Sequence, residues 1–202
     1  MLKSCCFEHF PGTMKLLLHI CCGPCSSATV EAWRQEGVAV TGTFFNPNIH
    51  PYNEHRRRYE TLMDYARAIE LPLIGEPHYD IKEWLKQVAG SEEHGVRCRI
   101  CIAQRLRHTA RLAADGGFDA FSTTLSISRY QDHDLIVEEG RKAGKEFGVE
   151  FIYRDLTHHY HRSVELSREA GMFRQNYCGC IYSEEEAARE REESKRKKKG
   201  TR

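Results

Sequence analysis

Short apolar or β-branched runs alternate with amphipathic segments along most of the chain. The runs with strand character are 15–20, 38–45, 73–74, 118–122 and 150–153, and the segments with helical character are 26–35, 54–69, 99–114, 132–147, 163–170 and 183–199. Strands that alternate with helices pair in parallel, because a parallel pair needs a long crossover connection. The sequence therefore predicts an α/β fold of three layers, in which helices cover both faces of a mostly parallel sheet of about five strands.

The length fits one domain with appendages. The chain has 202 residues, of which 40% are apolar, and this is enough for a single folded core. We expect an N-terminal appendage over residues 1–13, an α/β domain over 14–187 and a charged, basic tail over 188–202. From about residue 190 onward we expect the tail to be frayed or disordered.

Charge and hydropathy exclude two classes of protein. A formal net charge of +1 argues against a uniformly basic nucleic-acid binder, although six of the 30 basic residues lie in 195–202. This run is either a solvated tail or a contact for RNA phosphates. The longest apolar run, 16–22, is too short to cross a bilayer, and residues 1–6 lack the pattern of a signal peptide. We therefore expect a cytoplasmic protein with no membrane partner, in which thiols stay reduced.

Seven of the nine cysteines form three tight clusters. These are Cys21-Cys22-Gly23-Pro24-Cys25, Cys98-Arg99-Ile100-Cys101 and Cys178-Gly179-Cys180. Thiolates select zinc, copper(I) or iron–sulfur clusters. The clusters thus indicate soft-metal or redox chemistry, whereas Cys5 and Cys6 in the N-terminal appendage are interpreted as incidental.

The clusters and two polar loops are expected to meet at one edge of the sheet. Cys21 and Cys22 follow the first predicted strand, the loop 46–53 follows the second, and 123–131 follows the fourth. Ligands of parallel α/β folds bind at the carboxyl ends of the strands. Cys98 opens a predicted helix, whose first N–H groups favour a thiolate.

The cysteine spacings alone leave several alternatives open. Cys21 and Cys22 with Cys98 and Cys101 supply four ligands for a structural zinc ion, although adjacent cysteines are unusual in such sites. The Cys22–Cys25 pair also matches a thioredoxin-like dithiol. The third cluster is either two ordinary free thiols or a small, strained and redox-active disulfide.

Two groups of histidines also allow two interpretations each. His158, His159 and His161 are either surface side chains or metal ligands. His133, at a predicted helix start, is either a cap-region side chain or a proton donor. For the helix over 26–35, Ser26 or Ser27 is expected as the cap and Gly37 as the stop.

Five motifs in the same order carry a resemblance to a known family. They are Leu17-Leu18-His19-Ile20-Cys21-Cys22-Gly23-Pro24-Cys25-Ser26, Asn46-Pro47-Asn48-Ile49-His50-Pro51, Arg97-Cys98-Arg99-Ile100-Cys101, Thr123-Thr124-Leu125-Ser126-Ile127-Ser128 with Tyr130-Gln131-Asp132-His133, and Phe173-Arg174-Gln175-Asn176-Tyr177-Cys178-Gly179-Cys180. Together they resemble the cobalamin-independent epoxyqueuosine reductase family over residues 14–187.

The resemblance implies a Rossmann-like iron–sulfur enzyme. By position, Cys21, Cys22, Cys98 and Cys101 are similar to the family's [4Fe–4S] ligands. Cys178 and Cys180 match its redox-active pair. Some members bind a second iron, for which Cys25, Cys178 and Cys180 are the candidate ligands here, although other members carry Asp at position 25.

The resemblance also implies a reaction and a substrate. The family reduces the epoxide of epoxyqueuosine at the wobble position of tRNA, in the last step of queuosine formation. The expected proton donors are His133, Asp132 and Tyr130, and the expected contacts to the base are Asn46, Asn48, Tyr52, Thr123, Thr124 and Gln131. Arg56, Arg57 and Arg58 are candidates for phosphate contacts, and for at least one of them we expect an ordinary solvated helix face instead. Because the chain has no GxGxxG and no P-loop, we expect an external electron donor.

Two other function classes fit parts of the sequence. One is a zinc-binding module that holds RNA with its basic tail. The other is a PP-loop-like tRNA thiolase or nucleotide transferase, which needs a Gly/Ser-rich loop after the first strand. Pro24 occupies that loop, and it lacks the N–H group that would bind a phosphate.

Overall fold

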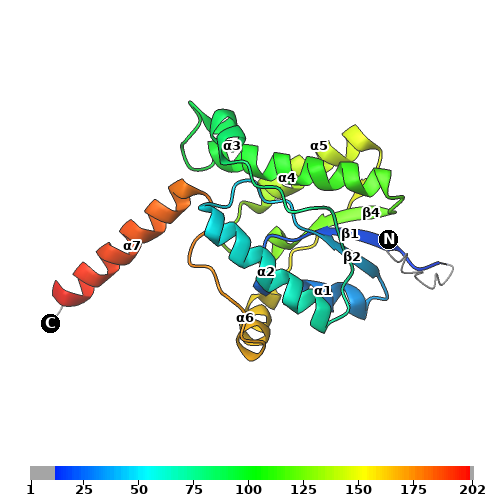
Figure 1. The fold of residues 1–202 in the computed structure, drawn as a ribbon, viewed down its shortest axis with the longest axis horizontal. Coiled ribbons are helices and arrows are strands. Elements are labelled where there is room, and N and C mark those ends of the chain that lie inside the picture. Colours follow the sequence, from blue (N-terminus) through cyan, green and yellow to red (C-terminus); the bar gives the residue numbers. More distant parts are fainter. Residues whose placement is uncertain (1–11, 201–202) are drawn as a thin grey trace.

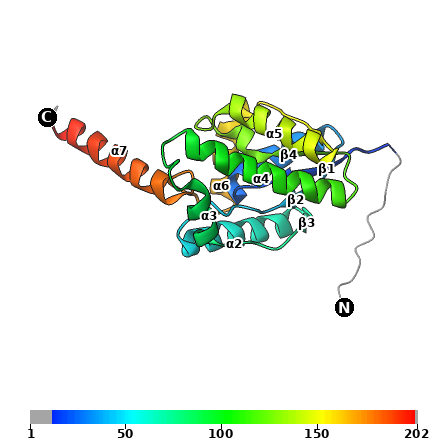
Figure 2. The same ribbon diagram turned by 90° about the horizontal axis from the view of Figure 1, so that it is seen from above.

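The computed structural model describes residues 12–200, which form a five-stranded sheet with helices on both faces (Figures 1 and 2). The strands are β1 (Lys15–His19), β2 (Ala39–Thr43), β3 (Leu73–Ile74), β4 (Ala120–Thr123) and β5 (Glu150–Phe151). Their order across the sheet is β3-β2-β1-β4-β5, and every neighbouring pair is parallel. The predicted α/β fold with about five parallel strands is confirmed.

The central strand β1 separates two cores. Leu16 and Leu18 pack with Val30 and Leu62, which belong to α1 (Gly23–Gln35) and α2 (Tyr52–Ala68). Leu17 points to the opposite face, where the second core is formed mainly by α4 (Val96–Asp115) and α5 (His133–Phe147). Alternate residues of a strand face opposite sides of the sheet, so a strand whose three central residues are all buried leucines must have helices on both of its faces. Figure 1 shows the two helical layers, with α6 (Tyr160–Glu169) beside α1.

Helix α1 begins earlier than the sequence predicts. Its first residue is Gly23 and its cap is Cys22, whose sulfur accepts a hydrogen bond from the Cys25 N–H at 3.4 Å. Pro24 fits the first turn because its missing N–H would have no partner there. The predicted caps, Ser26 and Ser27, are therefore wrong: both lie inside the helix, and their hydroxyls donate back to the carbonyls of residues 23 and 24.

Three short elements are absent from the prediction. They are the helix α3 (Ile81–Val88) and two 3₁₀ turns, η1 (Thr124–Ile127) and η2 (Thr157–His159). Asp80 caps α3 by accepting from the Glu83 N–H at 2.9 Å. Trp84 and Val88 are fully buried against Cys101 and Cys180. A helix of about two turns with one buried face has too few apolar residues for its periodicity to be recognised in the sequence.

The last helix, α7 (Ile181–Gly200), projects away from the body of the protein (Figures 1 and 2). Near its start, Glu186 forms an ion pair with the buried Arg97. Side chains 191–198 are all exposed. The basic segment, which was expected to fray from about residue 190, instead continues the helix to Gly200, and i,i+4 pairs such as Glu185–Arg189 support it.

The rest of the expected termini lies outside the described residues. This applies to most of the N-terminal appendage, including Cys5 and Cys6, and to residues 201–202. Within 12–200, none of the helices is both long and apolar enough to span a membrane.

The contact between α5 and the edge strand β5 gives a test of the packing. A Cβ atom placed on Gly140 would lie 2.2 Å from the Phe151 ring, far inside van der Waals contact. We expect Gly140→Ala to lower the free energy of unfolding by about 1–3 kcal/mol, because the ring must move out of its site. Urea denaturation measures the effect. The exposed Arg141 on the same helix is the control, and an equal loss in Arg141→Ala would contradict this packing.

Candidate metal and redox site

A cavity of about 660 Å³ opens at the carboxyl ends of β1 and β4. The connection through α1 leads to β2 on one side of β1, and the connection through α4 leads to β4 on the other side. Ligands of parallel sheets bind at such a point, where the direction of the connections reverses. Six cysteines line the cavity: Cys21, Cys25, Cys98, Cys101, Cys178 and Cys180. The structure therefore brings all three cysteine clusters of the sequence to one site.

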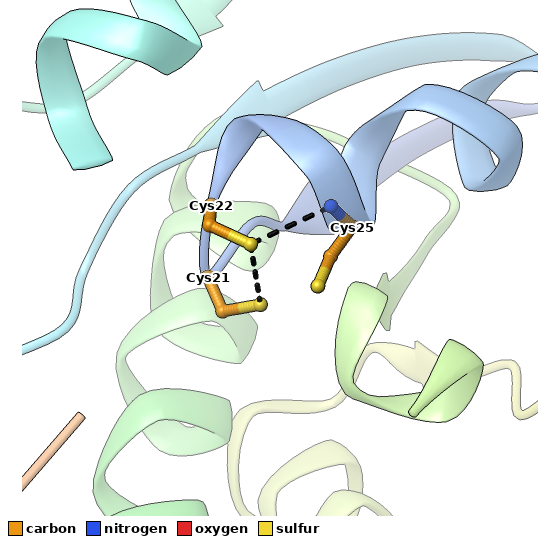
Figure 3. Close-up of side chains that lie close together, drawn as sticks. All are labelled: Cys21, Cys22 and Cys25. Atoms are coloured by element: carbon orange, nitrogen blue, oxygen red, sulfur yellow. Dashed lines mark hydrogen bonds between the residues drawn. The ribbon is translucent and has the colours of Figure 1, made fainter. Parts of the chain in front are cut away.

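Cys21, Cys22 and Cys25 form a compact group of sulfur atoms at the start of α1 (Figure 3). All three sulfurs lie within 4.8 Å of one another, and those of Cys21 and Cys22 are 3.7 Å apart. Among the described residues, this is the only group of three side chains that could share one metal ion. Cys25, which the sequence left as an uncertain ligand, thus belongs to the group.

The ends of β1 and β4 fix the position of Cys21. Its N–H donates to the Thr124 hydroxyl at 3.1 Å, and that hydroxyl donates to the Cys21 sulfur at 3.4 Å. Beneath it, the fully buried His19 bonds to Thr123 at 2.8 Å and to Asn46 at 3.3 Å. Burial, followed by the nearby Arg105 charge, lowers the pKa of His19 to about 3, so the ring is neutral. Since the Asn46 oxygen only accepts, the ring proton is on Nε2.

The three thiols cannot all ionise without a cation. Hydrogen bonds from the Cys22 and Cys25 thiols hold the pKa of Cys21 well below its usual value. Burial raises the pKa of Cys22, and the hydrogen bonds to Cys21 and Cys22 raise that of Cys25. A buried site that gathers three thiols but stabilises one negative charge is suited to a metal, whose positive charge allows the others to ionise.

Cys98 and Cys101 lie on the first turns of α4 and line the same cavity. Cys98 packs in the same apolar cluster as Cys21. The indole N–H of Trp84 points at the Cys101 sulfur, 3.3 Å away. Burial raises the pKa of the Cys101 thiol to about 12. An iron–sulfur cluster takes its thiolates at separate iron atoms, so its ligands need not converge as closely as those of one ion.

The Cys178-Gly179-Cys180 segment lies on the loop that precedes α7. Cys178 is exposed and accepts a hydrogen bond from Gln131 at 3.4 Å, whereas Cys180 is buried and accepts from the Ser183 N–H at 3.3 Å. All seven cysteines of the described residues are free thiols. The disulfide considered for this pair is therefore not formed in the structure, where the pair is a dithiol.

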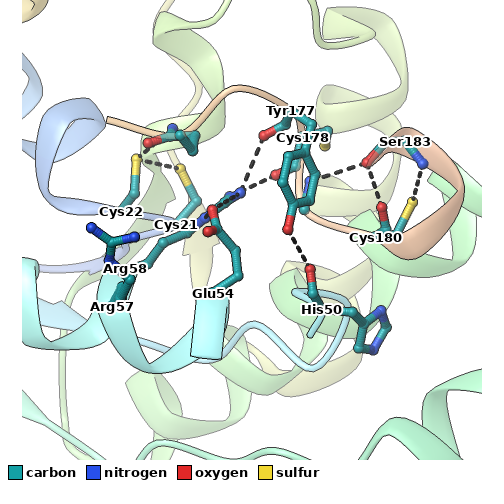
Figure 4. Close-up of polar contacts among 12 residues, drawn as sticks. Cys21, Cys22, His50, Glu54, Arg57, Arg58, Tyr177, Cys178, Cys180 and Ser183 are labelled. Atoms are coloured by element: carbon teal, nitrogen blue, oxygen red, sulfur yellow. Dashed lines mark hydrogen bonds and ion pairs between the residues drawn. The ribbon is translucent and has the colours of Figure 1, made fainter. Parts of the chain in front are cut away.

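Arg58 holds this loop from the inside (Figure 4). Its side chain is 1% exposed, and it donates to the carbonyls of Cys178 at 2.8 Å and Tyr177 at 3.2 Å. Glu54 pairs with it at 2.8 Å. Arg58 was a candidate for phosphate contacts; in the structure its guanidinium is engaged by these two carbonyls and by Glu54. Of the neighbouring arginines, Arg56 pairs with Glu60 and Arg57 lies over the Phe173 ring.

The polar residues predicted to contact the base or to donate a proton lie in three places. Asn48, Thr124, Gln131, Asp132 and Tyr130 line the cavity. Asn46 and Thr123 lie beneath it as the partners of His19. Tyr52 lies on α2 and contacts Tyr79, with their ring centres 5.3 Å apart.

The predicted histidines lie apart from the thiols. His133 uses both ring nitrogens locally, at 2.6 Å from the Tyr153 hydroxyl and 2.8 Å from the Ser128 carbonyl. Asp132, in contrast, caps α5 through the Leu135 N–H and also reaches the cavity. The ring centres of His158 and His159 lie 4.2 Å apart just before α6, with the ring planes tilted by 45°.

Two cavity residues had no predicted role, although one belongs to a quoted motif. Gln175 donates to the Cys22 sulfur at 3.0 Å, and its buried oxygen has no hydrogen-bond partner. Arg105 is 3% exposed and follows Cys101 by one helical turn. A glutamine in a loop and an arginine on a helix carry no signal in a sequence, because only the fold turns them toward the thiols.

Replacing Arg58 tests its role in holding the loop. Arg58→Lys keeps the charge near Glu54 but loses the fork that bonds two carbonyls. We expect Cys180, which is 6% exposed, to react several-fold faster with iodoacetamide, as measured by peptide mass spectrometry of the metal-free protein. The matched control is Arg56→Lys, which changes an exposed ion pair. Equal alkylation rates in Arg58→Lys and wild type would show that the loop does not depend on this residue.

Comparison with known proteins shows the family of the chain. The chain matches the family described as epoxyqueuosine reductase QueH over residues 16–186. A relative of that name from Dehalococcoides mccartyi is 41% identical over 172 residues, covering 85% of this chain and 93% of the relative. One from Thermotoga maritima is 33% identical over 175 residues, covering 83% of this chain and 89% of the relative.

Solved structures share the fold at low sequence identity. A predicted tRNA methyltransferase subunit from Methanocaldococcus jannaschii has a TM-score of 0.52 at 12% identity, covering 77% of this chain and 75% of the other. The U34-tRNA thiolase NcsA from Methanococcus maripaludis, solved with its [4Fe-4S] cluster, has a TM-score of 0.53 at 13% identity, covering 85% of this chain and 61% of the other. These two likenesses concern the fold alone. The family match and the identity to its curated members show that the chain belongs to the epoxyqueuosine reductase QueH family, a family of oxidoreductases.

Proposed function

We propose that this enzyme reduces epoxyqueuosine to queuosine at the wobble position of tRNA, with a [4Fe–4S] cluster and a redox-active dithiol in one cavity. The observation that carries the proposal is the convergence of six cysteines from three separate segments on that cavity. Membership of the family supplies the reaction. The rival zinc module would need only four of these thiols, which leaves the others without a role.

The donor set fits an iron–sulfur cluster. Cys21, Cys22, Cys98 and Cys101 are the proposed ligands, and all are thiols, the ligands that such clusters require. N–H groups already point at two of these sulfurs: those of Gln175 and Cys25 at Cys22, and that of Trp84 at Cys101. When bound, the cluster supplies electrons one at a time. Cys25, Cys178 and Cys180 remain as candidate ligands for a second iron.

The reaction needs two electrons and two protons. Both C–O bonds of the epoxide break, the carbon–carbon double bond forms, and the oxygen leaves as water. Oxidation of Cys178 and Cys180 to a disulfide releases two electrons and two protons. An external donor would then reduce the pair for the next turnover. Gly179, between the two cysteines, lets the loop pass close to Ile49, because a Cβ there would lie 3.0 Å from the Ile49 side chain.

The polar residues of the cavity are proposed to orient the base and deliver a proton. Gln131 already bonds to the Cys178 sulfur, and Asp132 follows it at the cap of α5. Asp132 is the better-placed donor toward the epoxide oxygen, because both nitrogens of His133 are engaged by other groups. Asn48 has a buried oxygen with no hydrogen-bond partner, which is available to a donor group on a base.

The cavity rim and α7 suit an RNA loop. Tyr130 lies at the rim and is 82% exposed, so its ring is open to stacking against a base. The first turns of α7 also line the cavity, through Ser183, Glu186 and Glu190. The basic end of the same helix, 195–199, extends outward, where phosphate contacts would strengthen binding at low salt.

Anaerobic purification with iron and sulfide analysis, followed by nucleoside mass spectrometry of tRNA bearing epoxyqueuosine, tests the proposal. We expect a brown protein with about four irons per chain and conversion of the epoxide to the alkene. Cys98→Ser and Cys101→Ser should lose most of the iron, because each removes one ligand. A colourless wild-type protein, or full iron in both variants, would contradict the cluster assignment, and unchanged tRNA would contradict the reaction.

The dithiol is tested separately from the cluster. We expect Cys178→Ser and Cys180→Ser to keep most of the iron while turnover falls at least about 100-fold, corresponding to the loss of about 2.7 kcal/mol of transition-state stabilisation. Cluster absorbance and single-turnover conversion measure the two effects. Loss of the cluster would make the pair structural ligands, and full activity in both variants would show that the pair takes no part.

A further inference from the structure

Three arginines are buried in the described part of the chain: Arg58, Arg97 and Arg105. Arg58 is paired with Glu54, and Arg97 with Glu186. Arg105 has no such partner, since no Asp or Glu within residues 12–198 forms an ion pair with it. Within the described residues, the hydrogen bond given by its side chain runs from Nε to the carbonyl of Cys101 at 2.9 Å.

A buried cation without a counter-ion is costly, because the charge has lost its water and gained no opposite charge. Arg105 lines the thiol cavity, so the missing anion must be a group that occupies or lines that cavity. Three acidic residues line the cavity, and none of them forms an ion pair with Arg105: Asp132 caps α5, Glu186 pairs with Arg97, and Glu190 lies on α7. The remaining sources of negative charge are the cysteines and an incoming ligand.

The surroundings of Arg105 favour the cysteines. The residue lies on α4 one turn beyond Cys101, and its hydrogen bond ties the two together. Cys98, Cys101 and Cys178 line the same cavity as Arg105, and their thiols are groups that become anionic when they bind a metal.

We propose that Arg105 is the built-in counter-charge of an anionic, thiolate-ligated metal centre in this cavity, and that it sets the redox potential of that centre. The inference rests on the proposed cluster but not on the identity of the substrate. A thiolate-bound iron–sulfur cluster carries net negative charge, which increases on reduction. A fixed cation therefore stabilises the reduced form more than the oxidised form and raises the potential. Arg105 is a positioning residue, because it acts through the centre and not on the substrate.

The test compares Arg105→Gln, which removes the charge, with Arg105→Lys, which keeps it. Iron content is measured first, and the midpoint potential of the reconstituted protein is then titrated by EPR, without substrate. We expect a more negative potential in Arg105→Gln and a value near wild type in Arg105→Lys. Arg111→Gln, an exposed arginine on the same helix, is the control and should leave the potential unchanged.

Each outcome decides the inference. Arg105→Gln could fail to assemble the cluster. In that case, normal iron content in Arg105→Lys supports the role of Arg105 as a counter-charge, and an equal loss of iron in both variants overturns it. An unchanged potential in Arg105→Gln overturns it as well. A higher KM for tRNA with an unchanged potential would show that Arg105 binds a substrate phosphate instead. A wild-type protein with a normal cluster that does not convert epoxyqueuosine would contradict the proposed function and leave this inference standing.

Discussion

The hydrogen bonds that join the ends of β1 and β4 determine where the thiols lie. Thr123 bonds to the buried ring of His19, and Thr124 bonds to the backbone and sulfur of Cys21. These contacts connect residues more than 100 positions apart in the chain. Because β1 is the middle strand and is buried on both faces, its end cannot move without disturbing both cores. The start of α1, with Cys22 as its cap, is therefore held rigidly.

A second set of contacts ties the C-terminal segment to this rigid frame. Arg58 reaches through the fold to two carbonyls of the loop before α7, and the His50 N–H donates to the Gly179 carbonyl at 2.8 Å. A charged fork that bonds carbonyl oxygens orients a loop more strictly than apolar packing does. As a result, Cys178 stays exposed to the cavity while Cys180 is buried beside Trp84.

The electrostatics of the cavity follow from burial. Thiols at this depth resist ionisation, as the raised pKa values of Cys22 and Cys101 indicate, and a buried arginine without a carboxylate is equally unfavourable. With the proposed metal centre bound, the two costs would offset each other, because the metal would displace the thiol protons and the anionic centre would share the cavity with the arginine.

The sequence by itself determined the α/β class, the five strands and the family. Strand and helix alternation depends on local periodicity, and the cysteine motifs are contiguous, so both can be read without a structure. It also indicated that the segments after β1 and β4 would meet, because the carboxyl ends of parallel strands share one edge. From the sequence, the cap of α1 was misplaced, α3 was missed, and a frayed segment was expected where α7 continues. The first two depend on how side chains pack locally, and the third depends on ion pairs along the helix.

Only the tertiary structure decided the side-chain environment of the site. It separated Asn48 and Thr124, which line the cavity, from Asn46 and Thr123, which lie beneath it. It showed that Arg58 is buried, whereas its neighbours Arg56 and Arg57 are exposed on the same helix. It also showed that Arg105 and Gln175 lie beside the thiols. The physical reason is the same in each case: a residue's burial and partners are set by contacts distant in the sequence, which no local pattern records.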